Sequence, residues 1–472
     1  MARPIVHHDD DCSVATRRGS VFGSMAGRRL LLLLVFLTAV GLPAGVLSAA
    51  CAGRSCAGSD DGPAHDPFCP LPGGVRTAIE NGYHEDRSPD VMVVTGQDGT
   101  LAGPQAVTSG RIAWPSAGDA AARVPLLFTG AGLDADAEIP DGTTLDRIAP
   151  TVAEAIGLRR PFPDVRSGTA IPGVASGSTP HLVVIVTWAG VGSATLEAHP
   201  NEWPSLRRLV RDDPATLEAD PASLPLDPAA VLATIGTGGL PSQHGMTGSV
   251  VRNDHGDATV AFGPGADYTV IATLAEDLDE QNDDEAFIGL VAPRTEYRGL
   301  IGGEWYRDRG EPDDDVVVDA SAAGLLRGTE RMIDDLAGSI AGRDEVTDLI
   351  GVVLEGDLDS LDRWTARIIA AADRAAHGRA LIVVTGTGDA ADATATDGER
   401  VIVQAAAGVP GGTELIEDVV PGGVFLDQDV LAREGATGQS VVDALLAERA
   451  DDGRPVFRDA FQGFAVSFAR YC

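Results

Sequence analysis

Lysine is absent from this sequence of 472 residues, so all 35 of its basic residues are arginines. They are outnumbered by 70 acidic residues, which gives a formal net charge of −35. Proteins gain affinity for nucleic acids when their cationic side chains release counterions from the phosphates. A chain with this excess of negative charge gains no such affinity, so we expect no nucleic-acid partner. GC-rich coding explains the arginine usage without a functional role.

Long low-complexity tracts are also lacking. With 44% apolar residues, 57 Gly and 29 Pro, the composition is that of a globular protein. A chain of this length holds one large α/β domain or two to three average ones.

The longest apolar run extends from Leu30 to about Ala52 and follows two arginine pairs. Basic residues before roughly 20 apolar ones are typical of a signal peptide or a single transmembrane anchor. We expect a cytoplasmic leader at 1–29 and a signal peptide or anchor at 30–52. The main domain then lies outside the cytoplasm, as a single-pass cell-membrane protein or, after cleavage, as a secreted one.

Cysteine is scarce. Cys12 lies in the leader, and the others are Cys51, Cys56, Cys69 and Cys472. An even number of cysteines in an oxidising compartment predicts disulfides. Metal binding is the competing interpretation, but the sequence contains no CxxC pair and no histidine cluster near these cysteines.

Runs rich in Val, Ile and Leu alternate with helical stretches. The predicted strands are Val91–Thr95, Val124–Thr129, Leu182–Thr187, Ala286–Val291, Leu349–Leu354 and Leu381–Thr385. The predicted helices are Pro204–Arg211, Tyr268–Leu278, Ala320–Ala341, Asp359–His377 and Ser440–Arg449. Near-continuous apolar strands suit central positions, so the pattern predicts an α/β fold, a mostly parallel central sheet with helices on both faces.

The most specific motif occupies residues 229–248, Ala-Ala-Val-Leu-Ala-Thr-Ile-Gly-Thr-Gly-Gly-Leu-Pro-Ser-Gln-His-Gly-Met-Thr-Gly. It resembles the segment that follows the nucleophile in the alkaline phosphatase superfamily, in its type I phosphodiesterase/nucleotide pyrophosphatase branch. The matching residues are Thr234, Thr237, Gly238, Pro241, His244 and Gly245. The nucleophilic Thr or Ser position falls on Pro228, which has no hydroxyl.

The order of the other matching segments implies a circular permutation. Residues 124–132 and 146–157 resemble the family's final strand and helix, yet they precede 181–188, which resembles its opening strand. A duplicated half-domain is the alternative, but residues 412–472 contain no second copy of the pattern.

The permutation implies a division of the chain and a disulfide pairing. The expected parts are a Cys-containing linker (53–69) and an alkaline phosphatase-like domain (70–472), made of a moved C-terminal part (70–177), an N-terminal part (178–400) and a small α+β cap region (401–472). Cys69 and Cys472 should then face each other where the ancestral chain was continuous, with Cα atoms about 4.4–6.8 Å apart. Cys51 would pair with Cys56.

Family members bind two zinc ions through three Asp and three His, and the metal lowers the pKa of the nucleophile beside it. The corresponding positions here are Thr187, Trp188, Glu355, Asp359, Thr387 and Gly388. The last His should precede Val124, but residues 114–123 contain none. At most two ligands remain, and two carboxylates do not hold a dinuclear zinc site. We therefore expect no catalytic residue, no metal site and no cofactor.

Other residues leave alternatives open. Glu355, Asp357 and Asp359 are either ligands of a hard cation such as Ca²⁺ or Mg²⁺ or a solvated turn with a helix N-cap at Asp359. In the family the residue at His244 is structural. Asp254-His255-Gly256 spells a tripeptide of the family's metal site but lies in a polar turn. The residues that either line a pocket or pack as a cluster are Arg294, Tyr297, Trp305, Tyr306 and Arg307.

The leading hypothesis is a catalytically inactive superfamily member that acts outside the membrane as a binding or structural module. Its partner would be an envelope protein or an envelope ligand. The alternative is an active metal-dependent phosphoesterase with an atypical site. A third hypothesis is a protein that binds a phosphate-sized ligand without chemistry.

Overall fold

The computed structural model describes residues 68–95, 100–101, 114–115, 122–134, 136–283, 285–302, 315–338, 346–389, 398–449 and 453–472. All of them belong to the unit His65–Cys472. The leader, the apolar run at 30–52, and Cys51 and Cys56 lie outside the described residues. Among the helices of the described ranges, none is long and apolar enough to cross a bilayer.

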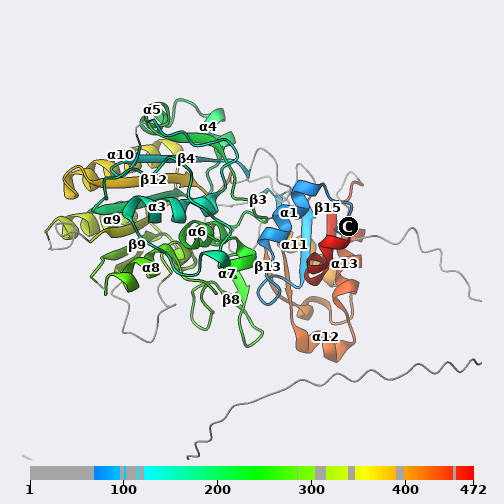
Figure 1. Cartoon of the computed structure of the whole chain (residues 1–472). Helices are drawn as coiled ribbons and strands as arrows, with labels where there is room; N and C mark the ends of the chain where they lie inside the picture. The colour runs from blue at the N-terminus through cyan, green and yellow to red at the C-terminus, as the bar shows by residue number, and fades with distance from the viewer. Residues whose placement is uncertain are drawn as a thin grey trace, which may run out of the picture. The chain divides into compact units, whose positions relative to one another are not determined.

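The larger sheet has the strand order β10-β9-β11-β5-β12-β4-β6. Its strands are β10 (Asp315–Val318), β9 (Ile288–Ala292), β11 (Asp348–Leu354), β5 (Leu182–Trp188), β12 (Ala380–Gly386), β4 (Val124–Gly130) and β6 (Ala215–Ala219). Figure 1 labels three of these strands, β9, β12 and β4. Strands β10, β9, β11, β5 and β12 are parallel, whereas β4 is antiparallel to both β12 and β6. This sheet and its helices confirm the predicted α/β fold.

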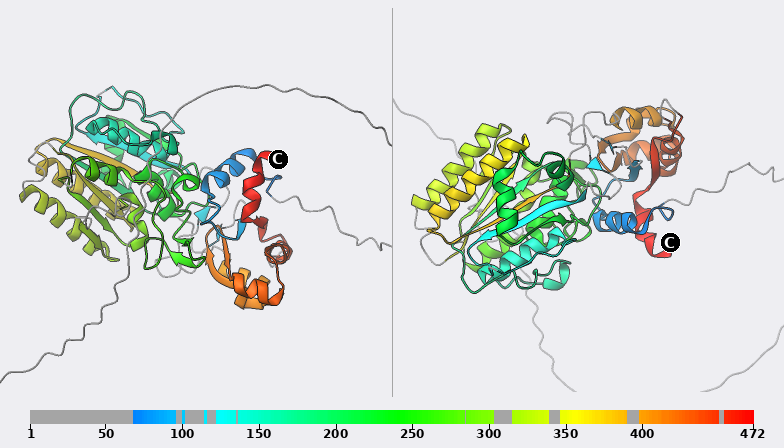
Figure 2. Two further views of the ribbon diagram at one scale, coloured as in Figure 1. Left: turned by 60° about the horizontal axis from the view of Figure 1, so that its bottom comes forward. Right: turned by 90° about the horizontal axis from the view of Figure 1, so that it is seen from above.

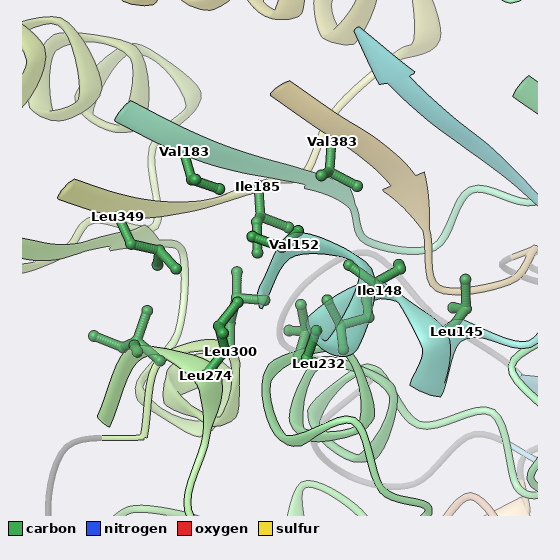
Figure 3. Close-up of a cluster of buried hydrophobic side chains, with 14 of the residues drawn as sticks. Leu145, Ile148, Val152, Val183, Ile185, Leu232, Leu274, Leu300, Leu349 and Val383 are labelled. Atoms are coloured by element: carbon green, nitrogen blue, oxygen red, sulfur yellow. The ribbon is translucent and has the colours of Figure 1, made fainter. Parts of the chain in front are cut away.

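Helices cover both faces of the larger sheet. Along β5, Val183 and Ile185 belong to one apolar cluster, whereas Val184 and Val186 belong to the other, because successive strand side chains point to opposite faces. The helices of the first cluster are η2 (Leu145–Arg147), α3 (Ile148–Ile156), α6 (Pro228–Thr237), α8 (Leu274–Gln281) and η4 (Thr295–Leu300). Those of the second are α4 (Ser193–Ala198), α5 (Pro204–Asp212), α9 (Ala322–Gly338) and α10 (Leu358–Ala375). Figure 2 shows α9 and α10 side by side, and Figure 3 shows Ile148 and Leu232 beneath the sheet in the first cluster.

A second, smaller sheet combines segments from the two ends of the described chain. It is antiparallel, and its strands in order are β13 (Ile416–Val420), β14 (Gly423–Leu426), β1 (Val91–Thr95) and β15 (Phe457–Gln462). Strand β1 is therefore predicted correctly as a strand, but its expected place in the central sheet is wrong. Burial on both faces marks a strand as central without saying to which sheet it belongs, and β1 is central in the smaller one.

Helices also cover both faces of the smaller sheet. On one face lie α11 (Gly398–Ala406), η6 (Gly412–Leu415), α12 (Gln428–Glu434) and α13 (Gly438–Ala447). On the other lie α1 (Gly73–Gly82) and η7 (Gly463–Tyr471). The remaining short elements are β2 (Thr100–Leu101), β3 (Trp114–Pro115), η3 (Pro163–Val165), α7 (Pro241–His244), β7 (Val250–Arg252) and β8 (Ala258–Val260).

Cys69 and Cys472 form a disulfide, with their Cα atoms 5.2 Å apart and a sequence separation of 403. The predicted pairing is confirmed. The bond joins Cys69, four residues before the start of α1, to the residue after η7, and both helices pack on the same face of the smaller sheet. Whether the chain is a permuted form of an ancestral fold remains a prediction.

One predicted helix starts later than expected. The stretch predicted from Tyr268 forms α8 only from Leu274, because Thr273 caps it. The Thr273 hydroxyl accepts from the Glu276 N–H over 3.2 Å, and the Glu276 carboxylate accepts from the Thr273 N–H over 2.7 Å. This reciprocal capping box fixes the first turn.

Candidate functional site

The candidate site lies at the carboxyl ends of the parallel strands of the larger sheet. In register, Trp188 at the end of β5 is opposite Leu354 of β11 and Gly386 of β12. The residues that follow these strands therefore meet at one edge. In open α/β sheets this edge is where ligands bind, and most of the positions predicted from the family fall here.

Thr187 and Trp188, the last residues of β5, are part of the core. Thr187 is fully buried, and within the described ranges its Oγ1 has no hydrogen-bond partner. The Trp188 indole N–H donates to the Thr365 hydroxyl on α10 over 2.8 Å, in the apolar cluster of the second face. Neither residue offers a carboxylate at the sheet edge.

The segment after β12 forms a hydrogen-bonded turn. The Thr387 hydroxyl accepts from the Gly190 N–H over 2.9 Å. Gly388 follows with a positive φ of 108°. The Asp389 carboxylate then accepts from the N–H of Gly192, the N-cap of α4, over 2.7 Å. These residues connect the end of β12 to the start of α4.

Glu355 directly follows β11 and is a predicted ligand position that carries a carboxylate. Its Oε1 accepts from the Tyr297 hydroxyl over 2.8 Å and from the Arg294 Nε–H over 3.2 Å. The Arg294 guanidinium also lies 3.5 Å from Glu296. The side chains of Arg294 and Glu355 are only 17% and 22% exposed. The charge of Glu355 is therefore balanced by an arginine that follows the neighbouring strand.

The predicted nucleophile position lies at the N-terminus of α6. Pro228 is the first residue of this helix, and Asp227 is its N-cap. One Asp227 oxygen accepts from the Ala229 N–H over 2.9 Å and the Ser249 hydroxyl over 2.7 Å, and the other accepts from the Ser249 N–H over 2.8 Å. One oxygen therefore caps α6, and both accept hydrogen bonds from Ser249.

Burial is the largest influence on the pKa values of Asp227, Glu296 and Tyr297. It raises the pKa of Asp227, and the hydrogen bonds from Ser249 and Ala229 oppose that rise only in part. Burial likewise raises the pKa of Glu296 against the attraction of Arg294. Burial and then the Glu355 charge raise the pKa of Tyr297 well above its ordinary value, so its phenolate does not form near neutral pH.

The acidic cluster after β11 does not converge on a cation site. Asp357 is the N-cap of α10, with its carboxylate accepting from the Ser360 N–H over 2.9 Å. The predicted N-cap at Asp359 is wrong by two residues, because the extended backbone that a cap requires occurs at Asp357. Asp359 instead lies in the first turn, exposed, and pairs with Arg363 over 2.6 Å.

The donors at this edge do not fit zinc. Within the ranges that the structure describes, no three His, Cys, Asp or Glu side chains are grouped closely enough to hold a metal ion. Glu355 is bonded to Arg294 and Tyr297, and Asp359 points to a different partner. Zinc sites use three or four N, S or O donors at fixed geometry, and this edge supplies no such set.

The intact half of the motif has a structural role that hydrogen bonds define. His244 is fully buried, and its Nδ1 accepts from the Met246 N–H over 3.0 Å. Its Nε2 must therefore carry the proton, and it lies 3.0 Å from the Thr234 hydroxyl of α6. Burial, aided by the charges of His84 and Arg87, lowers the pKa of His244 to about 3. A neutral imidazole thus ties α7 to α6.

The glycines of the motif end the two helices that it forms. Gly238 follows α6 with a φ of 74°, and Gly245 follows α7 with a φ of 79°. This left-handed conformation favours glycine. Pro241 opens α7, where a missing N–H costs nothing. These residues shape a helical turn whether or not any chemistry occurs beside it.

The tripeptide Asp254-His255-Gly256 lies in the exposed turn between β7 and β8. The His255 N–H donates to the Asn253 side chain over 3.0 Å, which closes the turn. Of the predicted aromatic and arginine cluster, Arg294 and Tyr297 belong to the site described above. Trp305, Tyr306 and Arg307 lie outside the described residues.

Asp227 and Glu296 are not among the predicted site residues. Asp-Pro ahead of an apolar helix is the signature of an N-cap followed by Pro at the first helical position, so the sequence does contain a signal for Asp227. It contains none for Glu296, whose place beside Arg294 depends on the short helix η4.

No protein-family model matches the chain, and no curated protein matches it. Among solved structures, it is similar to the crystal structure of wild-type alkaline phosphatase PafA, with a TM-score of 0.43 and 13% identity. A mutant of PafA gives a TM-score of 0.41 and the same identity. Each alignment covers 58% of this chain and 77% of the other.

Proposed function

We propose that this chain is a non-catalytic member of the alkaline phosphatase superfamily, from its type I phosphodiesterase/nucleotide pyrophosphatase branch. In this proposal it acts outside the cytoplasm as a binding or structural module. The observation that carries the proposal is the contact of Glu355 with Arg294 and Tyr297 at the carboxyl ends of β9 and β11.

A carboxylate at this edge of the sheet is balanced by a positive charge beside it. In a metallophosphoesterase a divalent cation neutralises it and polarises the phosphoryl group. Here a guanidinium fixed to the chain supplies the positive charge, and it is shared with Glu296. Arginine remains protonated at any physiological pH and does not activate a hydroxyl as a metal does. Pro228, at the nucleophile position, has no hydroxyl to activate.

The motif at 234–245 supports membership of the superfamily. Its residues match a pattern that the branch uses to build the helical turn after the nucleophile, and they build such a turn here. The permuted order of the segments is part of the same proposal. It is supported by the smaller sheet, in which β1 pairs with β14 and β15, and by the disulfide between Cys69 and Cys472.

The proposed location is supported by the apolar run at 30–52 and by the disulfide, because structural disulfides form in oxidising compartments. The partner proposed is an envelope protein or an envelope ligand.

Zinc content and turnover of bis-p-nitrophenyl phosphate by the purified chain test the proposal. We expect zinc well below one ion per chain and no hydrolysis above background, with no change in Glu355→Gln. Stoichiometric zinc with hydrolysis that disappears on chelation and in Glu355→Gln would establish the active alternative. Thermal stabilisation by inorganic phosphate without turnover would favour the phosphate-sized ligand instead, because a ligand that binds the folded state raises its stability.

A further inference from the structure

Arg87, in the turn between α1 and β1, is a buried arginine for which the described part of the chain supplies no acid. It is 6% exposed, and among the described residues its one side-chain hydrogen bond runs from Nη1 to the Tyr268 carbonyl over 2.7 Å. Buried charges in proteins are normally paired, so this guanidinium lacks its usual counter-ion. We propose that Arg87 is the centre of a binding site for a small oxyanion, a carboxylate or a phosphoryl group that offers two oxygens.

Two other arginines are buried to the same degree, and both are paired. The side chains of Arg160 and Arg166 are 7% and 6% exposed. Their guanidinium nitrogens lie 2.7 and 3.3 Å from Oδ2 of Asp277, which is fully buried. At these two arginines the chain supplies a carboxylate of its own, whereas at Arg87 the anion has to come from outside.

The free edge of the Arg87 guanidinium reaches the surface. Nη1 is engaged with Tyr268, which leaves Nε and Nη2 as donors along one edge. Enclosed nitrogens without an acceptor occur in the described ranges at Arg252 and His84, but not at Arg87. Nε and Nη2 therefore remain within reach of a ligand. Their two N–H groups form the fork that holds a carboxylate or a phosphate through two oxygens.

The Arg87 side chain is held in place by the segment that contains the family motif. A Cβ atom at Gly245 would lie 3.2 Å from Cδ and 3.3 Å from Nε of Arg87, so the glycine leaves room for the arginine. The Arg87 backbone carbonyl accepts from the Arg252 N–H over 3.1 Å and from the Thr247 hydroxyl over 3.3 Å. The guanidinium is thus preorganised, and little conformational entropy is lost when an anion binds.

The charge of Arg87 acts on the titratable groups around it. Burial and then the Arg87 charge lower the pKa of His84, whereas Asp86 and Glu85 raise it by smaller effects. His244 also faces this charge, after burial and the charge of His84. At His84 the potential of the arginine therefore outweighs that of the two acids. These acids and the net charge of −35 repel a polyanion, which restricts the ligand to a small anion.

Binding of inorganic phosphate to the full chain, measured by equilibrium dialysis at constant ionic strength in sodium chloride, tests the proposal. Arg87→Gln removes the charge but keeps an amide donor for the Tyr268 carbonyl. Arg147→Gln is the matched control, because the Arg147 guanidinium also donates to backbone carbonyls, those of Thr169 and Ala170, over 2.9 and 2.8 Å. Circular dichroism verifies that both variants fold.

We expect one phosphate per wild-type chain, displaced by acetate. The affinity should be at least about tenfold weaker in Arg87→Gln, because hydrogen bonds to a charged group are the strong ones, and unchanged in Arg147→Gln. A second measurement needs no change at Arg87. Bound phosphate cancels part of the arginine's charge, so it should raise the pKa of His84 in the wild type, followed by proton NMR of the imidazole and assigned with His84→Gln.

Equal affinity in the wild type and Arg87→Gln overturns the inference and assigns the phosphate to another place on the chain. An equal loss in Arg87→Gln and Arg147→Gln overturns it as well, since the anion then binds arginines without selection. So does a wild type that binds no phosphate, or a pKa of His84 that stays unchanged when phosphate is saturating. None of these outcomes touches the proposed function, because the site uses no residue of the sheet edge and zinc content and hydrolysis are measured separately.

Discussion

The Nε–H of Arg294 donates to the carboxylate of Glu355 over 3.2 Å, and so joins the residues that follow two adjacent parallel strands, β9 and β11. Tyr297 adds a second hydrogen bond to the same oxygen. A charge pair this poorly solvated depends on both partners, since either one alone would be left without compensation. The electrostatics of the candidate site therefore depend on one arginine.

Replacing that arginine should destabilise the fold. Arg294→Gln leaves Glu355 and Glu296 without their cation, and we expect the free energy of unfolding to fall by about 2–3 kcal/mol, less than for a fully buried pair. The double variant Arg294→Gln/Glu355→Gln should be at least about 1 kcal/mol more stable than the sum of the single effects predicts. Urea denaturation measures both.

The control for this prediction is a solvated ion pair. Arg363 and Asp359 are 61% and 56% exposed, so Arg363→Gln should change the free energy of unfolding by less than about 0.5 kcal/mol. Strict additivity of the Arg294 and Glu355 substitutions would contradict the coupling.

Because Asp357, not Asp359, is the N-cap of α10, substitutions of these two acids should differ in their effect on stability. Asp357→Ala removes the acceptor of the Ser360 N–H and should cost about 1 kcal/mol in the free energy of unfolding. Asp359→Ala removes a solvated charge near the helix start and should cost less than about 0.5 kcal/mol. Thermal denaturation of the two variants side by side checks this, and an equal loss in both would place the cap elsewhere.

Loss of the disulfide should have a large effect because of the loop that it closes. The 403-position separation between Cys69 and Cys472 predicts a contribution of about 4–5 kcal/mol, toward the upper end of the usual range. Cys69→Ser/Cys472→Ser should lose that amount in urea denaturation without reductant. A reductant should then destabilise the wild type but not the double variant. Peptide mapping of the nonreduced protein that linked Cys472 to Cys56 would disprove the pairing.

Acid should weaken the fold through His244. Its pKa is about 3 in the folded protein and about 6.5 when exposed. Below pH 6.5 the unfolded chain therefore takes up a proton that the folded chain refuses, so stability falls as the pH drops from 6.5 toward 3. The loss is at most about 1.4 kcal/mol per pH unit, or about 4–5 kcal/mol in all. Above pH 6.5 the residue contributes no slope.

His244→Gln removes this proton uptake, so the free energy of unfolding of the variant should fall less steeply between pH 6 and about pH 4. Part of the slope should remain, because burial and the Arg87 charge also lower the pKa of His84. An identical slope in His244→Gln and the wild type would show that His244 does not titrate in this way.

Local patterns in the sequence predict most of the secondary structure but not the contacts that define the site. The apolar runs at β5, β11 and β12 identify strands because burial on both faces leaves almost no room for polar residues. The same criterion fails to assign β1 to the smaller sheet, since sheet membership depends on partners more than 300 residues away. Helix starts depend on single caps, which explains the errors at Thr273 and Asp357.

The contacts of the candidate site are harder to predict from the sequence than the secondary structure. Glu355 is a predicted ligand position, and Arg294 and Tyr297 are predicted only as a possible pocket or packing cluster. What unites them is the adjacency of β9 and β11, which follows from strand order rather than from any local signal. The pairing of Cys69 with Cys472 was predicted because the family resemblance, unlike local periodicity, carries information about distant parts of the chain.

The bond between Cys69 and Cys472 turns the described domain into a covalent loop with a short stem on its N-terminal side. When the chain before Cys69 is pulled, the disulfide divides the force between α1 and η7. Strand β1 is then not separated from β14 and β15 one residue at a time. A protease that cuts one exposed turn inside the loop likewise releases no fragment. The nicked molecule stays in one piece until a reductant opens the loop.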